Sequence, residues 1–150
     1  PTLLKSPILH ASTSNSVKVS EENLNIIKRA MEKVSLDEFG TGRNFRLGIK
    51  GVEMAGKTGT VQVRRISTKE RESEEGVIKN EDRIWEWRDH ALYVGYAPMD
   101  KPRYAISVIV EHGGSGSSKA GPIARDIMEA TLKDDPTRFI PKNPIKKPII

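Results

Sequence analysis

The chain has 150 residues, of which 36% are hydrophobic and 30% are charged, a composition typical of one folded domain rather than of a disordered segment. Its 25 basic and 20 acidic residues give a net charge of +5 with both signs mixed, which argues against nucleic-acid binding. The absence of cysteine excludes disulfides, thiolate nucleophiles and zinc–sulfur sites. The histidines, His10, His90 and His112, lie in different segments, so we expect no metal site.

The first segment, residues 1–19, is predicted to be an irregular lead-in, because it holds two prolines and a Ser/Thr cluster. It shows no signal-peptide pattern, and no apolar run approaches the length of a membrane span. The chain does not begin with Met, so we expect it to be a piece of a longer protein. The main body is expected to span 20–133, and a Pro/Lys-rich tail 134–150.

A helix is predicted after Ser20, which is a good N-cap and is followed by two glutamates. Its apolar residues recur at helical spacing, so we expect one buried face, made of Leu24, Ile27, Ala30 or Met31, and Val34. Gly40-Thr41-Gly42 then ends the pattern.

Three strands are predicted next. Val61, Val63 and Ile66 alternate with polar residues, as in a strand. Residues 67–89 are dense in charge and lack a period, so we expect a long loop; Trp85 and Trp87 either pin this loop to the body or wall a cleft.

The second and third strands are expected at 91–98 and 103–112, antiparallel because their connection is short. The apolar 103–112 strand is predicted to be central and covered on both faces. A flexible glycine-rich link leads to a helix that begins at Pro122 and has an apolar face of Ile123, Ile127, Ala130 or Thr131, and Leu132. The fold class is therefore α+β, an antiparallel meander of about three strands with an N-terminal helix and a C-terminal helix packed on the sheet.

The segment GVEMAGKTGTVQV (51–63) allows two interpretations. Its first eight residues match the phosphate-loop pattern G-x-x-x-x-G-K-[ST]. A phosphate loop needs a helix that starts at the Lys-Thr, but glycine and alternating β-branched residues follow here, so a nucleotide site is the weaker interpretation.

The same segment contains Lys57-Thr58-Gly59, the K-T-G element of enzymes that penicillin acylates. On an edge strand, Lys57 would place a positive charge beside a nucleophilic serine, and the hydroxyls of Thr58 and Thr60 would bind a substrate carboxylate. Gly59 would let the substrate backbone approach, and the backbone amide of Thr60 would donate into an oxyanion hole.

Four blocks in a fixed order extend this second interpretation: GTGR (40–43), KGVEMAGKTGTVQV (50–63), RDHALYVGYAP (88–98) and RYAISVIVEHGGSGSSKAGPIARDIM (103–128). From about residue 20 to about residue 133 the chain resembles the C-terminal part of a transpeptidase domain of the class B penicillin-binding proteins, most of all the elongation type. Asp89, His90 and Gly40-Thr41-Gly42 resemble family positions to which we assign no catalytic role.

The resemblance implies a partial penicillin-binding/β-lactamase-like fold and a D,D-transpeptidase that crosslinks peptidoglycan stem peptides through a serine acyl-enzyme. It implies β-lactam binding, no metal or organic cofactor, a partner glycosyltransferase with elongation-complex proteins, and a parent protein anchored in the bacterial inner membrane with this domain in the periplasm. Stem peptides with a D-alanyl-D-alanine end are the implied substrates.

Two family motifs, S-x-x-K and S-x-N, do not occur in the sequence. The first carries the nucleophile, so we expect this chain to hold one wall of an active site, no nucleophile, and no activity alone. We also expect its sheet to expose surface through which copies self-associate. A nucleotide-binding module and a non-catalytic cell-wall or partner-binding module remain the alternatives.

Overall fold

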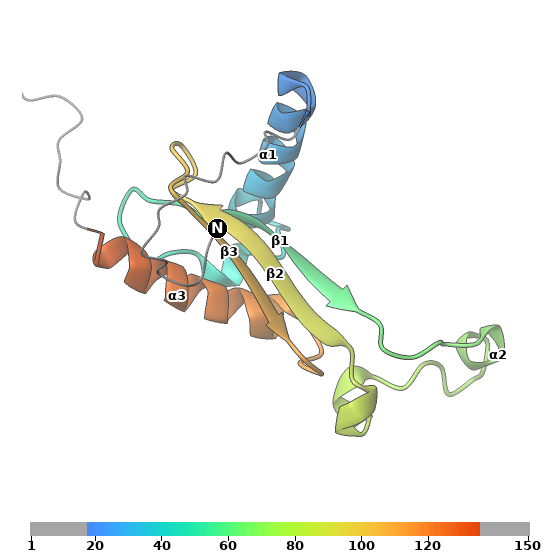
Figure 1. Ribbon diagram of the computed structural model, residues 1–150. Helices are drawn as coiled ribbons and strands as arrows, with labels where there is room; N and C mark the ends of the chain where they lie inside the picture. The colour runs from blue at the N-terminus through green and yellow to red at the C-terminus, as the bar shows by residue number, and fades with distance from the viewer. Residues whose placement is uncertain (1–17, 136–150) are drawn as a thin grey trace, which may run out of the picture.

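The computed structural model describes residues 18–135. Helix α1 (Glu21–Leu36) is followed by strand β1 (Ala55–Val61), the short helix α2 (Thr68–Arg71), strands β2 (His90–Ala97) and β3 (Tyr104–Val110), and helix α3 (Gly121–Lys133). The α+β class is therefore confirmed, with helices flanking the sheet (Figure 1). Within residues 18–135, no helix combines the length and the apolar character that crossing a membrane requires. The predicted lead-in, with His10, and the tail lie almost entirely outside the described residues.

The sheet has the order β1-β2-β3, and both strand pairs are antiparallel, as the short connection between β2 and β3 predicts. The expectation that 103–112 forms a central, doubly covered strand is wrong for the described residues. β2 lies in the middle and β3 at an edge, where its residues alternate between half-buried and exposed. Ile109 is 65% exposed, because no described element covers the second face of β3.

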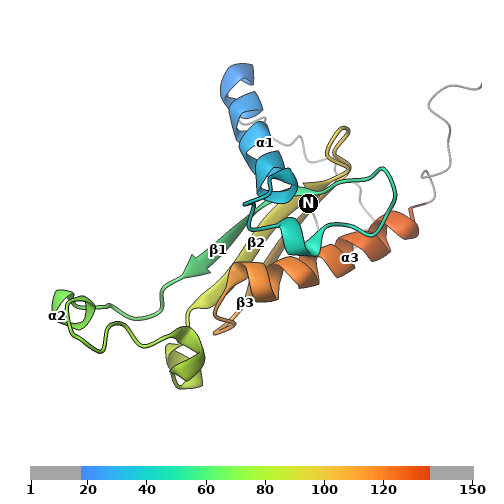
Figure 2. The same cartoon turned by 180° about the vertical axis from the view of Figure 1, so that it is seen from behind.

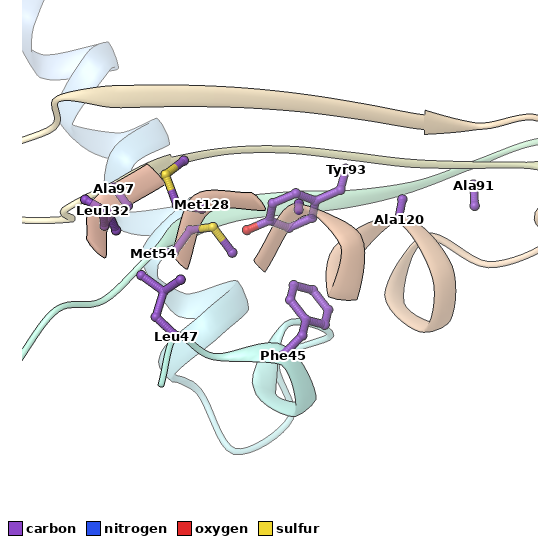
Figure 3. Packing of buried hydrophobic residues seen from close by; sticks show 10 residues of the cluster. Phe45, Leu47, Met54, Ala91, Tyr93, Ala97, Ala120, Met128 and Leu132 are labelled. Carbon is purple, nitrogen blue, oxygen red and sulfur yellow. The ribbon is translucent and has the colours of Figure 1, made fainter. Parts of the chain in front are cut away.

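The core lies between one face of the sheet and α3. Tyr93 points from β2 toward Phe45, and their rings meet edge to face at 5.3 Å (Figure 3). Met54 and Met128 fill the space beside them, and all four side chains are at most 2% exposed. This packing fixes the middle of the sheet on α3, which runs along the same face in Figures 1 and 2.

The predicted buried face of the C-terminal helix is only partly confirmed. Leu132 is buried as predicted, but Ile123 and Ile127 are 42% and 50% exposed, and the residues one position further on, Ala124 and Met128, contact the core instead. Both stripes are apolar and have the same period, so the pattern alone could not distinguish them. The helix start is confirmed, since Pro122 lies in its first turn.

The predicted buried face of α1 is confirmed only toward its C-terminal end, where Met31 and Val34 are half-buried. Ser20 caps the helix by accepting a hydrogen bond from the Asn23 amide at 3.3 Å, as expected. Leu24 and Ile27, however, are 43% and 54% exposed. In Figures 1 and 2 α1 stands away from the sheet, and only its C-terminal end lies beside β1.

Two connections are more ordered than predicted. The glycine-rich link contains a helical turn, Gly116–Ala120, in which Gly116 is buried against β1 and β2. The 67–89 loop contains α2 and the short helical turns Asn80–Asp82 and Trp85–Trp87. β1 ends at Val61 rather than near Ile66, because its last partner is His90, the first residue of β2.

Candidate active site

The K-T-G element lies in the middle of β1. Lys57, Thr58 and Gly59 pair with Val94, Tyr93 and Leu92 of β2. The strand continues through Val61, so no helix N-terminus is present to bind a phosphate. This geometry does not favour the nucleotide interpretation.

The register separates the side chains of the element onto two faces. Directly opposite residues share a face, so Thr58 and Thr60 lie on the face of Tyr93 and Ala91, which α3 covers. Lys57 lies on the other face with Val94. Thr58 is half-buried and Thr60 is exposed, so both hydroxyls lie near the strand's surface, on a common face as the alternation predicts.

The backbone of β1 also has two sides. A side chain on Gly116 would lie 2.3 Å from the Gly59 carbonyl oxygen, 2.5 Å from that of Leu92 and 2.9 Å from the Gly59 nitrogen. These three atoms therefore cluster between the strands, which places the polar backbone groups of Gly59 toward β2. Because such groups alternate along an antiparallel pair, we infer that those of Thr58 and Thr60 face the free edge.

The ammonium group of Lys57 reaches this edge. Its Nζ donates to the Thr58 carbonyl oxygen at 2.8 Å, and the side chain is exposed. Lys57 also lines a hollow of the surface together with Lys33 near the C-terminal end of α1 and with Phe39 and Thr41, which follow the helix. The edge of β1 thus combines an exposed positive charge, two hydroxyls and backbone groups without a neighbouring described strand.

Gly56, immediately before Lys57, is packed tightly. A side chain there would lie 2.0 Å from the Tyr93 hydroxyl oxygen and 2.6 Å from the Val94 carbonyl oxygen. Burial raises the pKa of Tyr93 to about 12, and an interaction with Ser35 opposes the shift. The glycine that resembled part of a phosphate loop is therefore required by the core beneath the strand.

A contact that the sequence did not reveal joins the Gly40-Thr41-Gly42 turn to this element. The Thr41 and Thr58 hydroxyl oxygens lie 2.9 Å apart, and either can donate. Nothing in the spacing of the two residues predicts this pairing. The turn was expected to end the helix, but α1 ends earlier, at Leu36, and the Gly42 amide instead donates to the Val34 carbonyl oxygen at 2.8 Å.

A polar cluster around Asp89 fixes the ends of the 67–89 excursion. The Asp89 carboxylate accepts from Asn80 at 2.9 Å, from Arg83 at 3.2 Å and from the Val63 amide at 3.3 Å. Arg83 and Asp89 are both buried, so this pair joins the chain leaving β1 to the chain entering β2. Asp89 thus has a structural role at the base of this loop.

His90 and His112 lie together although they are far apart in sequence. The His112 amide donates to His90 Nδ1 at 2.9 Å, and the rings are 4.7 Å apart. The Trp85 ring packs against that of His112 in a tilted arrangement, with the centroids 4.3 Å apart, which favours the pinning role for this tryptophan. Trp87 is 54% exposed. Within residues 18–135, no group of three or more potential ligands among His, Asp and Glu could hold a metal ion.

Comparisons with known proteins agree with this arrangement. The family model of the penicillin-binding protein transpeptidase domain matches residues 4–129. The peptidoglycan D,D-transpeptidase MrdA of Haemophilus influenzae is 38% identical over 105 residues, which are 70% of this chain and 15% of that protein. The chain thus spans only a small part of the curated relative.

Two solved structures share the fold. A complex of penicillin-binding protein 2 and MreC from Helicobacter pylori matches with a TM-score of 0.56 and 29% identity, covering 75% of this chain and 17% of that one. A ceftriaxone acyl-enzyme complex of penicillin-binding protein A from Mycobacterium tuberculosis matches with a TM-score of 0.50 and 28% identity, covering 76% and 22%. The chain therefore belongs to the penicillin-binding protein transpeptidase domain family.

Proposed function

We propose that this chain forms the K-T-G wall of a peptidoglycan D,D-transpeptidase, and that a segment outside the printed sequence supplies the nucleophilic serine. The observation that carries the proposal is the free edge of β1, which bears Thr58 and Thr60 and which the Lys57 ammonium group reaches at the Thr58 carbonyl oxygen. A peptide that pairs along this edge would place its carboxylate near the two hydroxyls. The similarity to a D,D-transpeptidase and to a penicillin-binding protein solved as an acyl-enzyme supports acyl transfer as the reaction.

In this proposal each residue has one task. Lys57 supplies positive charge beside the serine and the carboxylate, and the hydroxyls of Thr58 and Thr60 bind the carboxylate. Gly59 leaves room for the substrate backbone. The Thr60 amide donates to the oxyanion that forms when the serine attacks the D-alanyl carbonyl carbon; D-alanine then leaves, and an amine of a neighbouring stem resolves the acyl-enzyme.

Labelling with a fluorescent penicillin tests this function. The protein is extended upstream of Pro1 to its natural start, and the wild type is compared with Lys57→Ala and with Lys50→Ala, which removes an exposed lysine outside β1. We expect labelling of the wild type and Lys50→Ala, and a loss of about 100-fold in Lys57→Ala. Labelling of the 150-residue chain alone, or no labelling of the folded extended protein, would refute the proposal.

We further propose partners, ligands and a cellular location for the parent protein. The complex of a relative with MreC supports an elongation-complex partner, and a glycosyltransferase is the second partner that we propose. We propose β-lactams as ligands, an anchor in the inner membrane, and a periplasmic location for this domain. Protease accessibility of the domain in spheroplasts with an intact inner membrane tests the location, and protection from the protease would contradict it.

We also propose that the isolated chain self-associates through the exposed side of its sheet. Ile109 on the edge strand β3 and Val94 on β2 are 65% and 45% exposed. Sedimentation of the chain is expected to show a dimer or larger species that Ile109→Lys dissociates, whereas Ile26→Lys on the projecting helix α1 does not. A wild-type monomer at high concentration would contradict this.

A further inference from the structure

The Gly40-Thr41-Gly42 turn, which follows the end of α1, contacts the K-T-G element. Its central hydroxyl lies 2.9 Å from that of Thr58, the threonine of the K-T-G element. Thr41 also lines the same surface hollow as Lys57. The turn therefore contacts the candidate active site directly, although it precedes β1 by many residues.

The turn is held in one place by α1. The Gly42 amide donates to the Val34 carbonyl oxygen at 2.8 Å. A side chain on Gly40 would lie 2.3 Å from that same oxygen, and one on Gly42 would lie 2.9 Å from it. Only glycine permits such a close approach to backbone on both sides of Thr41.

A second tie fixes the chain after the turn. The Arg46 guanidinium donates to the carbonyl oxygens of Ser35 and Leu36 at 2.7 and 2.8 Å, so it caps the last turn of α1. Thr41 thus sits between two anchored points, and its hydroxyl is presented to Thr58 by a rigid support rather than by a free loop.

The hydrogen bond between Thr41 and Thr58 restricts the direction in which the Thr58 hydroxyl can donate its proton. A hydroxyl has one proton to donate and can accept two hydrogen bonds. When a carboxylate accepts the Thr58 proton, the Thr58 oxygen is free to accept the proton of Thr41, and the two bonds strengthen each other. We propose that Thr41 is a positioning residue that directs the Thr58 hydroxyl toward the carboxylate of the stem peptide or β-lactam. This inference rests on the proposed function.

The test measures acylation rates of the extended protein with a penicillin that carries its free carboxylate and with the methyl ester of the same penicillin. Thr41→Val keeps the shape and removes the hydroxyl. We expect it to slow acylation by the free acid about fivefold and to leave the ester rate unchanged. Thr41→Ser is expected to restore the acid rate, and Thr68→Val, an exposed threonine of α2, to change neither rate.

The ratio of acid to ester rates separates positioning from damage to the fold, because unfolded protein lowers both rates equally. In the double variant Thr41→Val/Thr58→Val, we expect acylation no slower than in Thr58→Val alone, since Thr41 acts through Thr58. Equal losses for acid and ester, losses that multiply in the double variant, or no loss in Thr41→Val would each overturn the inference while leaving the proposed function standing. A wild type that neither compound acylates would overturn the proposed function itself.

Discussion

Each half of β1 contains a glycine, but the two glycines have different roles. In the first half, Ala55 and Gly56 are buried, and Gly56 lies directly against the Tyr93 hydroxyl. In the second half the strand opens to the surface, and a side chain on Gly59 would touch only the Leu92 Cβ, at 3.3 Å. The packing of the core therefore requires glycine at position 56, whereas the fold does not require glycine at position 59.

This difference shows how the strand can be both an anchor and a binding edge. The packed half fixes the position of β1 on β2 and Tyr93, so the open half needs no cover of its own to stay in place. The same Gly→Ala change should therefore act on stability in one half and on chemistry in the other.

The largest expected effect is that of Gly56→Ala on stability. The new methyl group cannot fit between the strand and Tyr93, so the backbone or the ring must move, and we expect a loss of about 3 kcal/mol in the free energy of unfolding. Urea unfolding of the chain measures it. An unchanged midpoint would show that the first half of β1 is not packed as described.

A smaller effect is expected from the ionisation of Tyr93 beneath that half. Its pKa is raised to about 12 from 10.0, so the folded state holds the proton more tightly than the unfolded chain does. The resulting stability is fully present below pH 10 and is lost as the pH rises to about 12, by about 2 kcal/mol.

Unfolding at a series of alkaline pH values checks this expectation. Tyr93→Phe should flatten the decline, while Tyr96 and Tyr104, whose pKa values burial also raises, remain as a common background. A decline of the same slope in both proteins would mean that Tyr93 ionises as freely in the folded state as in the unfolded one.

The smallest effect on stability is expected for Gly59→Ala, within about 0.5 kcal/mol, because its methyl group meets only a side-chain carbon. In the extended protein, however, the same change should slow acylation by penicillin about tenfold, since it fills the space left for the substrate backbone. Unfolding and labelling measurements on this variant test the two expectations separately. Unimpaired labelling would remove Gly59 from the site and weaken the comparison between the two halves.

Much of the fold could be predicted from local signals. The short connection between β2 and β3 fixed their antiparallel pairing, and Ser20 and Pro122 marked the starts of α1 and α3. The burial of whole faces could not be predicted in this way. Ile127 and Met128 are both apolar and adjacent, and only the position of the sheet decides which of them is buried.

The candidate site was predictable where it is continuous in sequence. Lys57, Thr58, Gly59 and Thr60 lie in a strand at a sheet edge, as their pattern predicts, and their chemical roles remain predictions. Contacts between distant segments carried no such signal. The pairing of Thr41 with Thr58, and of His90 with His112, depends on how α1 and the loop after β3 return to the sheet.

The polar cluster around Asp89 has a consequence for engineering. Because Asp89 holds Asn80, Arg83 and the Val63 amide together, the excursion from the sheet is closed at its base. Its outer part, where Gly76 has no heavy atom within 4 Å of an added side chain, can vary in length at little entropic cost. Gly76 is thus a natural position for inserting a short epitope or a fluorophore-binding peptide that would report on this protein without disturbing the edge of β1.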